Sequence, residues 1–477
     1  MLRQVVNQSA IYLASIVISR AVNLVLLAFY ARVFKPEDFG TYDLLVAAMM
    51  FCNIAITLEV SQGVARFFPN APTTAEKRSY ATTGLWFTIL TYTLFSSLLW
   101  FFATPLADML VEDEKRENVL RAAAFSFWSN GLFYFLQNQL RWELKPLRYA
   151  VASLVFTLLS GGLAVALIII AGWGVESLFY GSFIGGLIAS LLAYWFVRES
   201  FNLNFDGSKL RRMISFSTPL ALSAMATITS LYADRIVIKE LMSLSDVGLY
   251  GVAYRFAAIA GLLLVGFQGT ITPMVTAHQH QQALQRDLGR LIEYFSIAAL
   301  STVFVLAVFS REIFELATSP EYHSAHSLLA ILAAATLLSG MYVFTPGLWL
   351  AARTKLILSV SVLTAVLNLL ANLTLVPKFG LLGAALALLA SATVHFCLYA
   401  ALGQRFYPLP TNWRRIGAAT ALCAIMILAG QQIQLQSITS VTFKAAYCAI
   451  GVIILASLII QKQVMLAEIG RRRRNGT

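Results

Sequence analysis

The sequence carries little charge for its length. Only 12% of its 477 residues are Asp, Glu, Lys or Arg, whereas 58% are apolar. Soluble domains carry charge on about a quarter of their residues, because charged side chains cover the surface that faces water. The shortage of charge argues against a soluble fold and indicates a chain whose outer surface faces lipid.

Cysteine and histidine are also scarce, with four and five residues respectively. Neither type recurs with the spacing of metal ligands, and the cysteines have no obvious disulfide partners. The sequence also lacks a glycine-rich phosphate loop and a nucleophile–base constellation. We therefore expect a protein that is not an enzyme and that holds no resident cofactor or metal. The cysteines, which we interpret as small core side chains, are Cys52, Cys397, Cys423 and Cys448.

Long apolar runs are what the sequence has in abundance. Runs of about 20 residues, the length that crosses the hydrocarbon core of a bilayer, recur between short polar breaks. No soluble domain interrupts them. They predict an all-α polytopic membrane protein with about fourteen transmembrane helices, at 9–32, 42–65, 80–103, 119–140, 148–171, 176–197, 214–238, 248–273, 288–310, 326–350, 355–376, 380–402, 414–431 and 441–461.

The basic residues predict the orientation of these helices. Most of the 35 lysines and arginines fall in alternate breaks, while the break around Glu112 and Asp113 on the other side is acidic. Because lysine and arginine concentrate on the cytoplasmic side, both termini are expected to be cytoplasmic. The net charge of +12 then lies at a membrane surface. It favours anionic membrane lipids over nucleic acid as partners.

Several features repeat at one nearly constant offset. The motif D-x-G-x-Y occurs at 38–42 and again, 208 residues later, at 246–250. Lys145 and Arg353 are also 208 apart, and Gly174 and Gly380 are 206 apart. These matches predict two six-helix lobes, 1–205 and 206–404, related by internal duplication, followed by two additional helices and a basic cytoplasmic tail in 405–477. Two similar bundles that rock around a central cavity form a transporter architecture.

Polar side chains form stripes at helical spacing on several predicted spans, and Arg20 lies in the middle of the first. Such residues either bond to neighbouring helices or line a cavity. The residues alone leave both interpretations open, with Arg20–Glu59 and Asp234–Arg255 as candidate ion pairs. In the cavity interpretation, the substrate-binding residues are Arg20, Asn23, Glu59, Gln62, Arg66, Asn130, Tyr134, Gln137, Arg141, Asp234, Arg255 and Gln268.

The stretches FKPEDFGTYDL, at 34–44, and NLTLVPKFGLLGAALALLAS, at 372–391, give the chain a family resemblance. It resembles polysaccharide transporters of the O-antigen flippase type, within the multidrug/oligosaccharidyl-lipid/polysaccharide flippase superfamily. The resemblance implies a V-shaped, alternating-access transporter in the bacterial inner membrane. It also implies that a polyprenyl-(pyro)phosphate-linked oligosaccharide repeat unit moves from the cytoplasmic to the outer leaflet for O-antigen, capsule or exopolysaccharide assembly.

The resemblance further implies a cationic cavity for the phosphate and sugar head group. The matching positions are Arg20 and Arg255, with Arg66 and Arg141 near the cytoplasmic mouth. Arginine suits this task because its planar guanidinium group binds phosphate oxygens bidentately and stays charged. Coupling to H⁺ or Na⁺ would use the carboxylates Glu59 and Asp234. Polysaccharide polymerase and chain-length machinery are further candidate partners.

Three alternatives stay open at this point. The first is a multidrug exporter of the same superfamily, although those favour acidic or aromatic cavities for cationic drugs. The second is a polytopic polysaccharide polymerase or ligase, which would need a large extracytoplasmic loop that the sequence lacks. The third is a structural scaffold or a passive scramblase.

Overall fold

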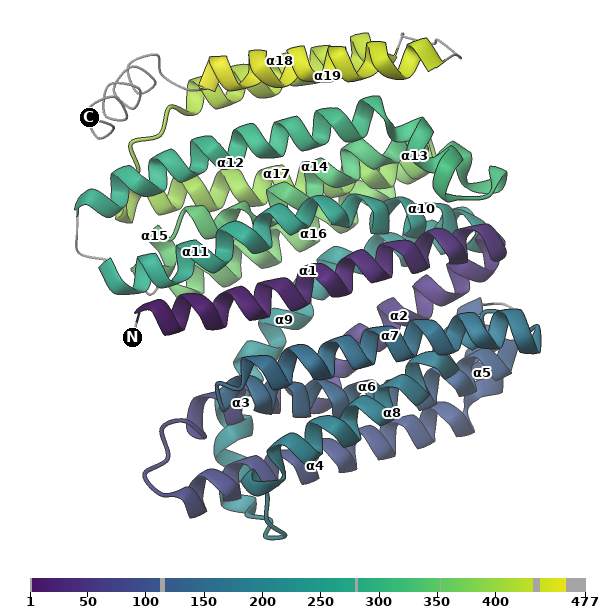
Figure 1. The fold of residues 1–477 in the computed structure, drawn as a ribbon, viewed down its shortest axis with the longest axis vertical. Helices are drawn as coiled ribbons and strands as arrows, with labels where there is room; N and C mark the ends of the chain where they lie inside the picture. The colour runs from purple at the N-terminus through teal and green to yellow at the C-terminus, as the bar shows by residue number, and fades with distance from the viewer. Residues whose placement is uncertain (1, 112–115, 279–281, 352, 432–437, 460–477) are drawn as a thin grey trace. The chain divides into compact units, whose positions relative to one another are not determined.

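In the computed structural model the described residues form helices joined by short connections, and no strand occurs among them (Figure 1). The structure describes residues 2–111, 116–278, 282–351, 353–431 and 438–459. The all-α prediction is therefore confirmed for this part of the chain. Contacts divide the chain into two compact units, Met1–Val252 and Ala253–Thr477.

The first unit consists of long helices and three short ones. Its core forms where α6, α7 and α8 pack together around side chains that include Phe133, Leu140 and Ala189. Its elements are α1 (Leu2–Val33), α2 (Pro36–Thr57), α3 (Val60–Phe67), α4 (Thr74–Phe101), α5 (Ala103–Val111), α6 (Glu117–Trp142), α7 (Pro146–Ala171), α8 (Glu176–Val197), the 3-10 turn η2 (Arg198–Ser200) and α9 (Gly207–Leu241), and α10 (Leu244–Ala257) crosses its boundary.

The second unit contains the C-terminal helices, and α18 lies beside α19 along their lengths (Figure 1). Cys423 and Cys448 are buried where α12, α18 and α19 meet, as expected of small core residues, whereas Cys397 on α17 is exposed. The elements are η3 (Ala258–Gly261), α11 (Leu262–His278), α12 (Gln282–Val308), α13 (Ser310–Ala317), η4 (Pro320–Leu328), α14 (Leu329–Gly340), η5 (Met341–Phe344), α15 (Gly347–Leu350), α16 (Thr354–Phe379), α17 (Leu381–Phe406), α18 (Trp413–Gln431) and α19 (Ile438–Ile459).

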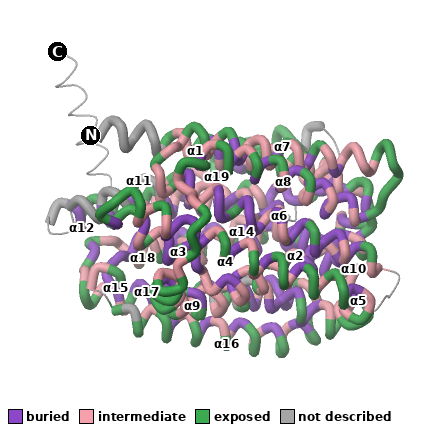
Figure 2. Tube along the Cα trace, turned by 90° about the horizontal axis from the view of Figure 1, so that it is seen from below, coloured by how far each residue is buried: buried purple, intermediate pink, exposed green. Residues whose placement is uncertain are grey.

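Among the described residues, twelve candidate spans are long and apolar enough to cross a membrane. The other two predicted spans, 119–140 and 214–238, fall on α6 and α9. These helices have 26 and 35 residues, which is sufficient length, but they carry more polar side chains. Many side chains on the membrane helices are exposed, and most of α16 is coloured as exposed in Figure 2. The chain is a multi-pass membrane protein.

Three predicted spans are not continuous α-helices. The span 42–65 breaks between α2 and α3, where Leu58 and Glu59 have φ angles of 46° and 53°. The span 248–273 contains the 3-10 turn η3. The span 326–350 is divided by η5 and by Pro346, which cannot donate a helical hydrogen bond. Short breaks of this kind leave the apolar run intact, so hydropathy alone does not reveal them.

The repeat is visible in two helical hairpins, α7–α8 in the first unit and α16–α17 in the second. Lys145 and Arg353 immediately precede α7 and α16, as their shared offset predicts. The turns that end these helices use Gly172 and Gly380, with φ angles of 66° and 59°. Gly172 and Gly174 both lie in the connection between α7 and α8, at offsets of 208 and 206 from Gly380, and the pairing of Gly174 with Gly380 stays a prediction.

The segment that leads into α9 is tied to α4. The backbone N–H of Asn202 donates to the hydroxyl of Thr82 at 2.8 Å, and the N–H of Asp206 donates to Thr83 at 3.1 Å. Asp206 then caps α9 by accepting hydrogen bonds from the first backbone N–H groups of that helix. This connection joins the two predicted lobes of the duplication, whose boundaries at 205 and 404 stay a prediction.

Candidate functional site

Arg20 lies near the middle of α1, a helix that packs on α7. Its side chain is exposed, and among the described residues it makes no hydrogen bond or ion pair. Asn23, one turn further on, is exposed as well, while Ser15 is buried and donates to the carbonyl of Tyr12. The expected Arg20–Glu59 pair does not form. An unpaired guanidinium in a membrane helix remains available to an anionic ligand.

Glu59 lies at the break between α2 and α3 and is half-buried. Its carboxylate accepts a hydrogen bond from Ser61 at 3.4 Å and interacts electrostatically with Tyr134 and Tyr92. Two successive residues other than glycine in the left-handed region cost of order 1–3 kcal/mol each, and such strain collects at functional sites. The structure thus brings two predicted residues, Glu59 and Tyr134, into one cluster.

Four further predicted residues lie toward the ends of α3 and α6. Gln62, Arg66 and Arg141 are exposed, and Arg141 interacts electrostatically with Tyr134 and with Tyr12. Gln137 instead bonds between helices, because its amide donates to Ser153 of α7 at 2.6 Å. The break at Glu59 takes this residue off the continuous helical face that was predicted to join it to Gln62 and Arg66.

Asn130 lines a small pocket between α2, α6 and α8. Its amide donates to Ser182 of α8 at 3.0 Å. The cavity has a volume of about 260 Å³ and also contacts Asn53, whose side-chain oxygen accepts a hydrogen bond from Tyr92 at 2.8 Å. Ligand pockets usually enclose about 300–1,000 Å³, so this space is too small for an oligosaccharide. Asn130 thus joins α6 to α8 within the first unit, and its role in substrate binding stays a prediction.

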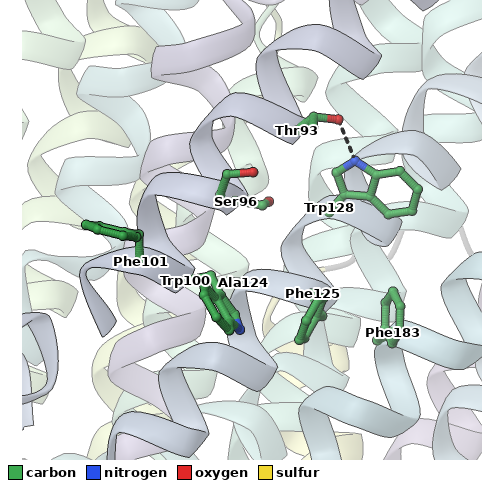
Figure 3. A pocket seen from close by; sticks show the side chains of 9 residues that line it. Thr93, Ser96, Trp100, Phe101, Ala124, Phe125, Trp128 and Phe183 are labelled. Carbon is green, nitrogen blue, oxygen red and sulfur yellow. Dashed lines mark hydrogen bonds between the residues drawn. The ribbon is translucent and has the colours of Figure 1, made fainter. Parts of the chain in front are cut away.

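A larger cavity of about 570 Å³ lies between α4, α6 and α8 and was not predicted (Figure 3). Figure 3 shows aromatic rings around it and the indole N–H of Trp128 directed at Thr93, to which it donates at 2.9 Å. Among the described residues that line this cavity, none carries a charge. Its surface suits hydrocarbon rather than a sugar phosphate. The lining residues are Thr93, Ser96, Ser97, Trp100, Phe101, Ala124, Phe125, Trp128 and Phe183.

Asp234 belongs to a buried ionic cluster of the first unit. Arg235 contacts Asp234 at 2.8 Å and Asp43 of α2 at 3.3 Å, and Tyr250 donates to Asp234 at 2.5 Å. Asp234 therefore pairs with its neighbour Arg235 rather than with the expected Arg255. The side chains of Arg235, Asp234 and Asp43 are 1%, 0% and 4% exposed, so one cation is buried between two carboxylates, away from solvent.

The second unit contains Arg255 on α10 and Gln268 on α11, both half-buried. It also contains a buried polar stripe that sequence analysis missed. Asn368 of α16 donates to Ser391 of α17 at 3.0 Å, and Asn372 donates back to the carbonyl of Asn368 at 2.9 Å. Their four-residue spacing was the available signal, hidden because this run is otherwise strongly apolar. Among the described residues, no cluster of His, Cys, Asp or Glu could hold a metal ion.

Comparisons with known sequences agree with this helical architecture. Residues 29–327 match the family described as polysaccharide biosynthesis protein. The chain is 25% identical over 266 residues to the succinoglycan biosynthesis transport protein ExoT of Rhizobium meliloti, covering 53% of this chain and 50% of ExoT. It is 27% identical over 181 residues to the probable low-salt glycan biosynthesis flippase Agl15 of Haloferax volcanii, covering 37% of this chain and 38% of Agl15. The chain thus matches half or less of each relative's length.

Solved structures share the fold. The lipid II flippase MurJ, in an inward closed conformation, superposes with a TM-score of 0.74 at 14% identity, covering 94% of this chain and 98% of MurJ. An inward-facing multidrug resistance MATE transporter of the MOP superfamily has a TM-score of 0.69 at 14% identity, covering 86% of this chain and 98% of its own. Because the family match covers more than half of the sequence, the chain belongs to the family of polysaccharide biosynthesis proteins.

Proposed function

We propose that the protein is a flippase for a lipid-linked oligosaccharide repeat unit, carried on a polyprenyl (pyro)phosphate. It would move this unit from the cytoplasmic to the outer leaflet of the bacterial inner membrane by alternating access, for surface polysaccharide assembly. The names of its relatives, a succinoglycan transport protein and a glycan flippase, support this substrate class. Polymerase and chain-length machinery would act on the translocated unit and are proposed partners.

The observation that carries the proposal is the exposed, unpaired guanidinium of Arg20 within a membrane-spanning helix. A charge at the centre of such a helix costs at least about 2.5 kcal/mol, so an unpaired one needs a compensating ligand or water. A phosphate supplies that ligand, since arginine binds its oxygens bidentately. Multidrug transporters share this fold, so the fold alone does not distinguish a flippase from a multidrug exporter. Arg20 favours the flippase, because its charge would repel a cationic drug.

The decisive experiment replaces Arg20 or Arg255 with alanine in a strain whose own gene is deleted. The deletion strain should hold undecorated lipid-linked repeat units on the cytoplasmic face. Neither variant should restore surface polysaccharide, although each inserts at the normal level, and Arg20→Lys should restore it in part. Arg311→Ala, which removes an exposed arginine paired with Glu315, should restore it fully. Full activity of Arg20→Ala would refute the assignment.

A further inference from the structure

A cavity of about 480 Å³ with charged lining residues lies in the first unit. It lies at the end of the unit where the connections between helices carry lysine and arginine. The walls come from the end of α3, the first turns of α4, the α6–α7 connection and η2. These breaks are predicted to be cytoplasmic, so the cavity lies at the level of the lipid head groups. The lining residues are Phe68, Pro69, Thr74, Lys77, Arg78, Trp142, Glu143, Leu144, Lys145, Glu199 and Ser200.

Of the charged side chains that line the cavity, two form an ion pair with each other and three do not. Lys145 contacts Glu143 at 2.5 Å, and Glu143 also accepts hydrogen bonds from Gln139 and Ser200. The side chains of Lys77 and Arg78 make no ion pair or hydrogen bond among the described residues, and neither does that of Glu199. Three cations against two carboxylates leave the lining with a net charge of +1. That charge complements a phosphodiester or another singly charged phosphate.

The cavity also has an apolar rim held in an unusual conformation. Leu144 has a φ of 55° and is 67% exposed, and Leu147 is equally exposed. Two backbone hydrogen bonds, from Leu144 to the carbonyl of Arg141 and from Lys145 to that of Leu140, close the end of α6 around this residue. Glycine is usual where a helix ends in the left-handed region, so a leucine there costs conformational energy and presents hydrocarbon outward.

We propose that this cavity binds the phosphate of a membrane lipid. Lys77 and Arg78 contact the phosphate oxygens, and Leu144 and Leu147 contact the first carbons of the chains. Positively charged pockets beside membrane helices are suited to anionic head groups, and the half-buried Trp142 is a residue typical of this interface. The site depends on the chain being a membrane protein and does not depend on the cargo that Arg20 is proposed to bind.

Native mass spectrometry of the purified full-length protein tests the site, with phosphatidylglycerol and a polyprenyl monophosphate as separate probes. Lys77→Gln/Arg78→Gln should weaken binding about a hundredfold, because each of the two lost charge-assisted contacts counts for about a factor of ten. Arg211→Gln/Arg405→Gln removes two exposed charges outside the cavity and should leave affinity unchanged. Glycine accepts the left-handed backbone at position 144, so Leu144→Gly should leave the fold intact. It should weaken binding, because it removes the side chain proposed to contact the lipid.

The outcomes separate the two sources of phosphate. Equal binding of both probes supports a site for bulk anionic lipid, and preference for polyprenyl phosphate supports a loading site for the cargo. Equal losses in the cavity variant and the Arg211/Arg405 control would overturn the proposal, because nonspecific charge would then explain binding. Arg20→Ala should retain lipid binding here, so failure of this site is distinguishable from failure of the flippase proposal.

Discussion

Gly40 of α2 and Gly248 of α10 lie in direct backbone contact within the first unit. A Cβ atom on Gly248 would lie 1.8 Å from the carbonyl oxygen of Pro36, and one on Gly40 would lie 2.0 Å from that of Leu244. Both glycines are the central residue of a D-x-G-x-Y motif. The two copies of the motif therefore contact each other through equivalent positions, as expected where duplicated elements meet about a common axis.

Gly40→Ala and Gly248→Ala should each destabilise the protein by about 1–3 kcal/mol, because neither helix can accommodate the added methyl without moving. Thermal unfolding in detergent, together with recovery of surface polysaccharide, provides the measurement. Gly162→Ala is the matched control, since a Cβ there meets no atom within 4 Å and alanine favours a helix. An unchanged melting temperature for Gly248→Ala would contradict the close approach.

Arg235→Gln should destabilise the protein by about 3–5 kcal/mol, since it leaves the carboxylates of Asp43 and Asp234 buried without their cation. Asp43→Asn combined with Arg235→Gln should recover part of that loss. A double-mutant cycle on thermal or denaturant unfolding measures the coupling. The exposed pair Arg311–Glu315 serves as the comparison, and its removal should cost at most about 1 kcal/mol. Additive effects at Asp43 and Arg235 would refute the pair.

Glu59 is the carboxylate that we expect to couple transport to an ion gradient. Glu59→Gln should abolish the dependence of substrate flipping on an imposed H⁺ or Na⁺ gradient in proteoliposomes, because an amide can neither release a proton nor hold a cation by charge. Asp234→Asn should instead lower stability, since Asp234 is engaged by Arg235 and Tyr250. Gradient dependence that survives in Glu59→Gln would assign coupling to another group.

The cap at Asp206 should make the stability of the protein fall in acid. The Ser208 hydroxyl and the Lys209 backbone N–H donate to its carboxylate and hold its pKa below the usual value. A depressed pKa stabilises the folded state above the unfolded pKa of about 3.9, and the contribution is lost as pH falls through the folded pKa. Asp206→Asn keeps a cap that does not titrate. Its melting temperature should therefore lie below the wild-type value near pH 7 and converge with it in acid.

Topology can be tested by thiol labelling in a background without the four native cysteines. Asn204→Cys should react only after the cytoplasmic side is made accessible, and Glu321→Cys should react from outside in intact cells. Both positions are exposed in the structure. The opposite pattern would invert the predicted orientation, in which both termini are cytoplasmic.

Hydropathy predicted the membrane class and the approximate positions of the helices, because long apolar runs have few alternative structures in lipid. The family was predicted from the resemblance of the stretches at 34–44 and 372–391. The repeat offset also located Lys145 and Arg353 at equivalent helix starts. The break at Glu59 escaped prediction because a left-handed pair of ordinary residues has no sequence signal comparable to glycine or proline.

Pairing of the buried charges was the other failure. Asp43 and Arg235 are 192 residues apart, and helical spacing relates only residues on the same helix. The Asp234–Arg255 pairing was inferred from depth alone, but the adjacent Arg235 reaches the same carboxylate. The burial of Asn368 and Asn372 could not be predicted either. The sequence does not show whether a stripe of amide side chains faces lipid, water or protein.

The anchoring of Asn202 and Asp206 on α4 has a mechanical consequence. Because hydrogen bonds to α4 hold the backbone of this connection at both ends, the connection cannot extend freely when the protein changes conformation. In the proposed alternating-access cycle, movement of the downstream helices would bend α9 itself, where Pro219 removes one helical hydrogen bond and lowers the resistance to bending.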